Sequence, residues 1–260
     1  SSYGGAIYAQ DAVFRLSNSI IRSNTSYQNG GAIYFQTSNS KIINTEIFGN
    51  SAQNAGGAFY VSGGNPEILN CTIAENTAPS GSQISTFDNA DPILINCVVK
   101  TVSSSNSLVN LSTRGNIEFR HCTLISIENL ISARDNCNVT MVNSIYSGLI
   151  NLHQLGSPDS LWMFNSNFDS TRLTIEYDFG NGGIVNENNF NYLNWTENNN
   201  FTDNPQFSET DYSLSIYSPC IGAGLDTSIV PSSDKDGNPR PNPSGSNPDI
   251  GAYENPFGTP

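Results

Sequence analysis

A small group of charged side chains offers this sequence its best prospect of chemistry. The group consists of Arg114, Arg120 and Arg134 with Glu118, His121 and Asp135. Elimination from an acidic polysaccharide needs a Lys or Arg base and a neutralising cation, often calcium held by acidic residues. Arg120, Glu118 and His121 could form such a patch, but His121 occupies a repeat position where we expect a structural role. We therefore interpret the group as ordinary surface and ladder residues and assign no catalytic residue. His153 stands alone and is expected to be a loop or core histidine.

One short motif could hold a metal ion. Asp234-x-Asp236-Gly237-Asn238 resembles part of a calcium loop, but it lacks the Glu that closes an EF-hand loop. An ordinary Asp-Gly turn is the preferred interpretation, and calcium stays as the alternative. No cofactor and no metal-binding residue is assigned.

The elements that would position these residues repeat along the chain. Gly4-Gly5-Ala6-Ile7-Tyr8 recurs as Gly30-Gly31-Ala32-Ile33-Tyr34 and as Gly56-Gly57-Ala58-Phe59-Tyr60, at steps of 26 residues. A second motif pairs Asn with a small residue, and its steps are 26, then 25 and 22 residues. Its members are Asn18-Ser19, Asn44-Thr45, Asn70-Cys71, Asn96-Cys97, His121-Cys122, Asn143-Ser144 and Asn165-Ser166.

Short β-branched segments flank each copy, as in Lys41–Ile47 and Glu67–Ile73, and no convincing helical periodicity occurs. A period of 22 to 26 residues built from short strands predicts one coil of a parallel β-solenoid. The Leu-x-x-Leu-x-Leu signature of leucine-rich repeats is absent. The fold class is therefore all-β, a right-handed parallel β-helix like that of pectate lyases, with about seven coils and a C-terminal cap.

Equivalent residues of successive coils should lie above one another, about 4.8 Å apart. The repeated Asn residues would then form a ladder at a bend, because an amide can both donate and accept. Five Cys are present, and Cys71, Cys97 and Cys122 follow the repeat. Stacked Cβ atoms would be too far apart for disulfides, which favour about 3.8 Å. We predict a reduced, buried thiol column, and three thiols in a row lack the tetrahedral closure of a metal site.

The repeat fades after about residue 170, which divides the chain into coils (1–170) and irregular final coils with a cap (171–260). We expect the cap to cover the last coil with its apolar residues. These are Phe207, Tyr212, Leu214, Ile216, Ile221, Ile250 and Tyr253. At the other end a typical repeat starts by residue 4 without a signal peptide or capping coil. We hypothesise that upstream coils were removed or that another molecule covers that end.

The C-terminal motifs resemble those of a known group of proteins. The closing Asp249-Ile250-Gly251-Ala252-Tyr253-Glu254 resembles the end of secreted bacterial right-handed β-helix repeat proteins whose export or anchoring tail varies. The Gly-Gly-Ala-Ile repeats with Ile47-x-x-Asn50 and Ile73-x-x-Asn76 are similar to those of chlamydial polymorphic outer-membrane adhesins, where the second motif usually starts with Phe. The resemblance spans nearly the whole chain and implies a β-helix at or beyond the cell surface.

β-Helix relatives also include polysaccharide lyases and glycoside hydrolases. Polygalacturonase-type hydrolysis uses clustered carboxylates, commonly in Asn-Thr-Asp, Asp-Asp and Gly-His-Gly motifs. None of these motifs occurs in the sequence. An enzyme of the pectate-lyase-like superfamily, most plausibly a polysaccharide lyase, therefore stays the alternative to a non-catalytic protein.

Charge narrows the set of partners. The net charge is −13, and the 10 basic residues are scattered along the chain. Nucleic acid and anionic membranes select clustered Lys and Arg, so neither is an expected partner. No apolar run is long enough to span a membrane. We expect a non-catalytic extracellular or cell-surface module for adhesion, display or assembly. Its partners would be polysaccharide or a surface protein, with self-association into filaments through coil ends as a further option.

Overall fold

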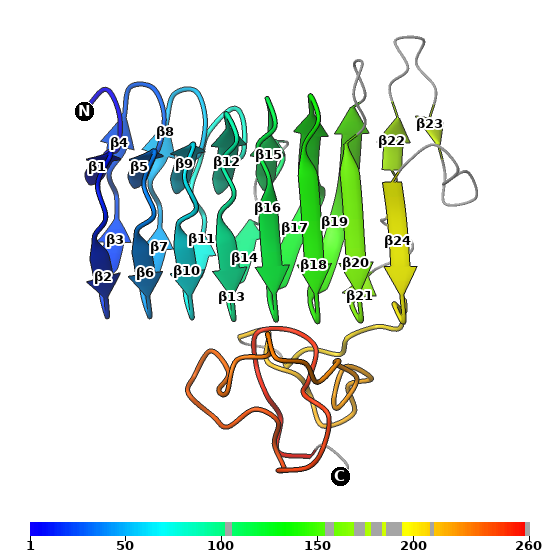
Figure 1. Cartoon of the computed structure of the whole chain (residues 1–260). Helices are drawn as coiled ribbons and strands as arrows, with labels where there is room; N and C mark the ends of the chain where they lie inside the picture. Colours follow the sequence, from blue (N-terminus) through cyan, green and yellow to red (C-terminus); the bar gives the residue numbers. More distant parts are fainter. Residues whose placement is uncertain are drawn as a thin grey trace.

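The computed structural model describes residues 1–101, 106–153, 159–168, 175–177, 184–185, 194–208 and 211–257. Within these ranges the regular elements are all β-strands, and their stacking is parallel except for the β22–β23 pair. Figure 1 shows the coils stacked side by side into a rod that runs from the N-terminal β1 to β24. The all-β parallel solenoid expected from the repeat is confirmed.

Each coil contributes one strand to each of three faces, which we call A, B and C in chain order. Face A begins with β1 (Ile7–Gln10), β5 (Ile33–Gln36), β9 (Phe59–Ser62), β12 (Ile84–Phe87) and β15 (Val109–Leu111). Face B comprises β2 (Arg15–Ser17), β6 (Lys41–Ile43), β10 (Glu67–Leu69), β13 (Ile93–Ile95), β16 (Ile117–Arg120), β18 (Asn138–Val142), β20 (Ser160–Phe164) and β24 (Asn194–Asn198). Face C begins with β3 (Ile20–Arg22), β7 (Glu46–Phe48), β11 (Thr72–Ala74) and β14 (Val98–Thr101).

The later coils join faces C and A directly. The long strands β17 (Thr123–Arg134) and β19 (Ile145–His153) belong to both faces, with register shifts between them. The earlier coils instead turn through an extra side that contains β4 (Thr25–Ser26) and β8 (Ser51–Ala52). The remaining strands are β21 (Asn167–Phe168), β22 (Ile175–Tyr177) and β23 (Ile184–Val185). Loss of the extra side accounts for the shortening of the repeat from 26 to 22 residues.

The register places residues one repeat apart directly opposite each other. Ile7 pairs with Ile33, and Ile33 pairs with Phe59. Ile33, Phe59 and their equivalents point inward and are fully buried, so the core is one continuous column along the rod. The repeated Gly pair allows this close stacking, because Gly30 has φ +69° and a Cβ on Gly31 would meet the Gly57 oxygen at 2.2 Å.

The repeated Asn residues form the corner between faces B and C, as predicted. We call Asn18, Asn44, Asn70, Asn96, His121, Asn143 and Asn165 the corner file. All have φ between +45° and +54°, a left-handed conformation that Asn adopts more readily than most residues. The Asn44, Asn70 and Asn96 amides each donate to the preceding Asn at 3.1–3.2 Å. These seven corners bound six turns, one fewer than the seven coils inferred by counting the motif.

The cysteines are all buried and free, in agreement with the predicted thiol column. The thiols of Cys71, Cys97 and Cys122 each donate to a backbone carbonyl two residues earlier, at 3.2–3.3 Å. Burial and the neighbouring thiols raise the pKa of Cys97 well above its ordinary value. The column is therefore a set of small, neutral, satisfied side chains.

A second ladder lies at the other side of face C and was not predicted. Asn24, Asn50 and Asn76 follow one another at one-coil steps, and Gln83 ends the series. The Asn50 side-chain oxygen accepts from both the backbone N–H and the amide of Asn24, at 3.0 and 2.9 Å. Asn50 and Asn76 are fully buried, so this ladder satisfies polar groups inside the coil.

The C-terminal residues 205–257 form an irregular segment that we call the bracket. Figure 1 shows it, in orange and red, beside the lower edge of the middle coils. Ile145 of β19 packs with Leu214, Cys220 and Ile250 of the bracket. The expected cap over the last coil is therefore wrong in position, because these apolar outward residues give the bracket a side surface to bury. Ile216, expected in the cap, is 54% exposed.

The strand β24 pairs in parallel with β20, so the solenoid extends beyond residue 170. Much of the stretch from 169 to 193 lies outside the described residues. The division at residue 170 therefore stays a prediction.

Candidate functional site

A row of tyrosines on the outer surface of face A is the main candidate for ligand contact. Tyr8, Tyr34 and Tyr60 occupy the same outward position of β1, β5 and β9. Tyr3 joins them from the preceding turn, and we call the four residues the tyrosine file. Adjacent ring centroids lie 5.0–6.0 Å apart. The repeat places an aromatic group on each coil because the fifth residue of Gly-Gly-Ala-Ile/Phe-Tyr alternates outward after a buried one.

Polar side chains two residues further along the strands hold the tyrosine hydroxyls. The Tyr8 hydroxyl donates to Gln36 of the next coil and to Gln10, the latter at 3.1 Å. Burial raises the pKa of Tyr34, while its hydrogen bond to Ser62 lowers it. Burial also raises the pKa of Tyr60 to about 12. The file therefore presents neutral hydroxyls and amides beside ring edges near neutral pH.

The aromatic surface is confined to the first coils. At the equivalent position β12 has Ser85 and β15 has Asn110, which pair in register with Tyr60 and each other. Tyr8 is 45% exposed, whereas Tyr34 and Tyr60 are half-buried against their neighbours. A ligand would therefore meet ring edges and hydroxyls along the file, together with the more open Tyr8.

The charged residues that suggested lyase chemistry do not form one site. The Arg120 guanidinium makes two 2.7 Å contacts with the Glu118 carboxylate. His121 instead lies buried in the corner file, as its repeat position predicted. Arg114, Arg134 and Asp135 are exposed, and only a backbone hydrogen bond joins Arg114 to Asp135. His153 is the last residue of β19, and nothing further is described of its side chain.

His121 instead connects the coils to the bracket. Its Nδ1 lies 3.1 Å from the Asp249 carbonyl oxygen, and its Nε2 lies 3.0 Å from the Asn143 amide nitrogen. These partners fit a neutral imidazole that donates from Nδ1 and accepts at Nε2. Burial, assisted by the positive charge of Arg240, lowers the pKa of His121 well below its ordinary value. Protonation would place two donors against each other at Asn143, so the contact fits structure rather than proton transfer.

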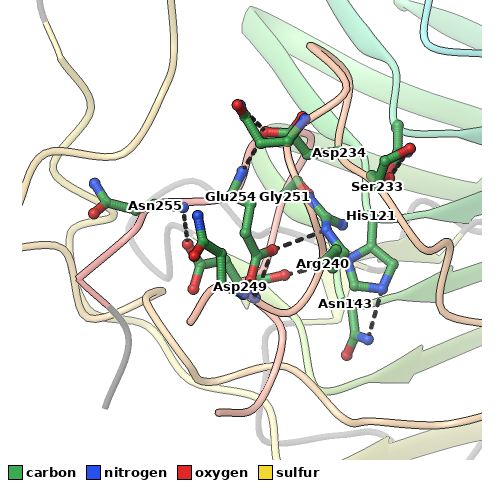
Figure 2. Close-up of polar contacts among 12 residues, drawn as sticks. His121, Asn143, Ser233, Asp234, Arg240, Asp249, Gly251, Glu254 and Asn255 are labelled. Carbon is green, nitrogen blue, oxygen red and sulfur yellow. Dashed lines mark hydrogen bonds and ion pairs between the residues drawn. The ribbon is translucent and has the colours of Figure 1, made fainter. Parts of the chain in front are cut away.

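Figure 2 shows the bracket residues gathered around this contact. Arg240 Nε lies 2.8 Å from Glu254 Oε2, and both side chains are fully buried. Asp249 accepts the backbone N–H groups of Gly222 and Asn255. Burial raises the pKa of Asp249 to about 6, although these hydrogen bonds oppose the shift. The closing Asp249–Glu254 motif thus fastens the bracket internally and against the coils, a role that sequence reasoning missed.

Asp234 forms the centre of a turn. One carboxylate oxygen accepts the N–H groups of Asp236 and Asn238, at 2.9 and 2.8 Å. The other accepts the Asn238 amide and the Glu254 N–H, at 3.0 and 2.9 Å. Four donors therefore use the acceptor sites of this carboxylate, as the preferred Asp-Gly turn requires. Among the described residues, no cluster of His, Cys, Asp and Glu has a metal-holding arrangement.

No helix within the described ranges is long and apolar enough to cross a membrane. A search of curated proteins and a search of solved structures found no significant match. The family model described as "Right handed beta helix region" matches residues 4–151, which is more than half of the 260-residue chain. The matched range covers the coils from the first Gly pair through most of β19. The protein therefore belongs to the right-handed β-helix family.

Proposed function

We propose that this protein is a non-catalytic module that binds polysaccharide along the tyrosine file. The carrying observation is the file itself, in which Tyr8, Tyr34 and Tyr60 stand at one-coil steps beside Gln10 and Gln36. Aromatic groups with a polar end provide apolar contact and hydrogen bonds to the same ligand. A chain of sugar residues lying along the rod can repeat those contacts from coil to coil.

The contacts of the charged residues favour binding over catalysis. Arg120 and Glu118 neutralise each other, and His121 is occupied inside the corner file. General acid-base chemistry needs a titratable group within reach of a substrate. Along the tyrosine file the described side chains are tyrosines, glutamines and serines instead.

We place this module outside the cell, in adhesion, display or assembly. The closing Asp249–Glu254 segment resembles that of exported bacterial β-helix proteins with varying anchors, and the Gly-Gly-Ala-Ile repeats are similar to chlamydial outer-membrane adhesins. A stiff rod suits such a role because its faces stay flat while they contact a long polymer. Immunogold labelling of intact source cells tests this location, and a purely internal signal would contradict it.

The binding test compares variants on immobilised polysaccharides, after a glycan array has identified the best ligand. Tyr34→Ala should weaken binding about tenfold or more, because it removes the central ring of the file. Tyr34→Phe keeps the ring and should lose less. Tyr217→Ala is the matched control, since Tyr217 is 78% exposed on the bracket. Equal binding by wild type and Tyr34→Ala would contradict the proposal.

The same ligands test the enzymatic alternative. Each polysaccharide is incubated with the protein, with and without calcium, and unsaturated uronate products and new reducing ends are measured. The proposal predicts no turnover. Robust product formation would show a lyase or hydrolase and overturn the non-catalytic assignment.

Self-association through the β1–β3 end is a further form of assembly. Val13 and Ile20 are strongly exposed there, and Phe14 is only partly buried against the core. Apolar residues beside open strand edges favour pairing with another chain. Electron microscopy should show end-to-end filaments, and Ile20→Lys should shorten them. Single rods at all concentrations would contradict assembly through this end.

A further inference from the structure

The bracket and face C enclose a groove that is separate from the tyrosine file. Its volume is about 450 Å³, within the usual range for a small-molecule site. Ile125 and Ile145 form the wall on the strand side, while Phe207 and Tyr212 form the opposite wall from the bracket. The groove lies over β17 and β19, whereas the tyrosine file lies over β1, β5 and β9.

An unsatisfied acceptor belongs to the lining of this groove. Asn167 is 1% exposed, and its amide nitrogen donates to the Asp203 carbonyl at 2.7 Å. This bond fixes the orientation of the side chain. The other end of the amide, Oδ1, is buried without a hydrogen-bond partner. Buried acceptors without a donor are uncommon and costly, so the site favours a ligand that brings an O–H or N–H group.

The charges around the groove balance each other. Asp203 is exposed in its wall, and Lys100 places Nζ 4.9 Å from the centre of the Tyr212 ring. One acid and one base give no net preference for a charged ligand. The aromatic and aliphatic walls favour C–H surface. A sugar ring has this combination of apolar faces and hydroxyl donors.

From this combination we propose that the groove binds a single uncharged pyranose ring, either a free sugar or the terminal residue of a glycan. One ring hydroxyl donates to Asn167 Oδ1, and the C–H surface of the ring contacts Phe207 and Tyr212. Because this site lies on face C, its occupancy is independent of polymer binding along the tyrosine file. The protein would then have two sugar sites of different kinds.

The test is titration of the full chain with neutral methyl glycosides, followed by ligand-detected NMR and isothermal calorimetry. Ser147→Phe fills the groove from β19, because Ser147 is half-buried in its lining. This variant should lower the affinity of the best glycoside about tenfold or more. Thr140→Phe is the matched control on face B and should bind as wild type does. Both variants should keep polymer binding along the tyrosine file.

A second variant tests the hydrogen bond. Asn167→Leu removes the unsatisfied oxygen and should also weaken glycoside binding, while a deoxy sugar that lacks the donating hydroxyl should bind wild type more weakly. The proposal is overturned if no neutral glycoside binds the wild type, if Ser147→Phe binds equally well, or if only charged sugars or purely apolar probes bind. Loss of polymer binding in Tyr34→Ala with glycoside binding intact would separate the two sites.

Discussion

In the coils, backbone N–H groups donate to carbonyls of neighbouring coils, whereas in the bracket many donate to buried carboxylates. The Asn44 N–H, for example, bonds the Leu69 oxygen one coil on. In the bracket, Glu254 accepts the N–H groups of Asn242 and Asp249. The coils thus distribute their polar contacts over many equivalent positions, while the bracket concentrates them on three acidic side chains. Single substitutions should therefore cost more in the bracket.

The largest expected effect is in the bracket. Arg240→Ala leaves Glu254 buried without its 2.8 Å ion-pair partner. We expect a loss of about 3–5 kcal/mol in the free energy that holds the bracket folded, because an unpaired buried charge is costly. Hydrogen exchange should rise across residues 211–257 and stay unchanged in the first coils.

The control for this change is the double variant Arg240→Met with Glu254→Gln, which removes both charges. It should recover much of the lost protection. If Arg240→Ala exchanged like wild type, the bracket would not depend on this ion pair, and the contrast with the coils would be wrong.

The two Asn ladders sharpen the comparison within the coils. Asn76→Ala removes a buried amide that donates to the Ile47 and Ala74 carbonyls and accepts from Asn50. We expect a loss of about 2–3 kcal/mol, because several buried groups lose their partners. The exposed corner residue Asn44 is the matched site. Asn44→Gly keeps the positive φ and should cost about 1 kcal/mol or less. Equal losses by urea unfolding would mean that burial does not decide the value of a ladder.

Asp159 is a buried carboxylate of the coils with a different environment from those of the bracket. One oxygen accepts the Cys137 N–H at 2.7 Å, and the other has no partner. Burial raises the pKa of Asp159 to about 6. The folded state therefore binds this proton more tightly than the unfolded state, and stability from this group is lost as pH rises through the folded pKa.

Asp159→Asn should therefore stabilise the protein by about 1 kcal/mol near pH 7.5, and this gain should vanish near pH 4. Urea unfolding of both proteins across this range measures the difference directly. A difference that does not change with pH would show that Asp159 does not titrate as described.

The smallest effect is expected on the coil surface. Lys41 Nζ lies 2.6 Å from Glu67 Oε2, and both side chains are partly exposed. Lys41→Met should change the free energy of unfolding by about 0.5 kcal/mol or less, because water and salt screen such pairs. A loss as large as that of Asn76→Ala would contradict the ranking by burial.

The repeat in the sequence was sufficient to predict the solenoid, the corner file and the thiol column. Each follows from a 26-residue step, because a coil repeats its environment when it repeats its length. The inner ladder was also visible at that step, in Ile47-x-x-Asn50 and Ile73-x-x-Asn76, but only as a family resemblance.

The bracket and the groove follow no period. Asp249 and His121 lie 128 positions apart, and no pattern in the chain pairs them. The groove likewise combines Ile125 with Tyr212 from unrelated segments. The predicted end cap failed for the same reason, because the apolar residues were recognisable while the surface that they cover was not.

The most direct test of the central claim is pyrene excimer fluorescence across the stacked coils. Pyrene on Gln36→Cys and Ser62→Cys should give strong excimer emission, because these positions are paired in β5 and β9 although 26 residues separate them. The control pair, Gln36→Cys with Lys41→Cys, is only five positions apart but lies on faces A and B and should give little. Excimer emission from the control pair and none from the stacked pair would contradict the coil-on-coil architecture on which the tyrosine file depends.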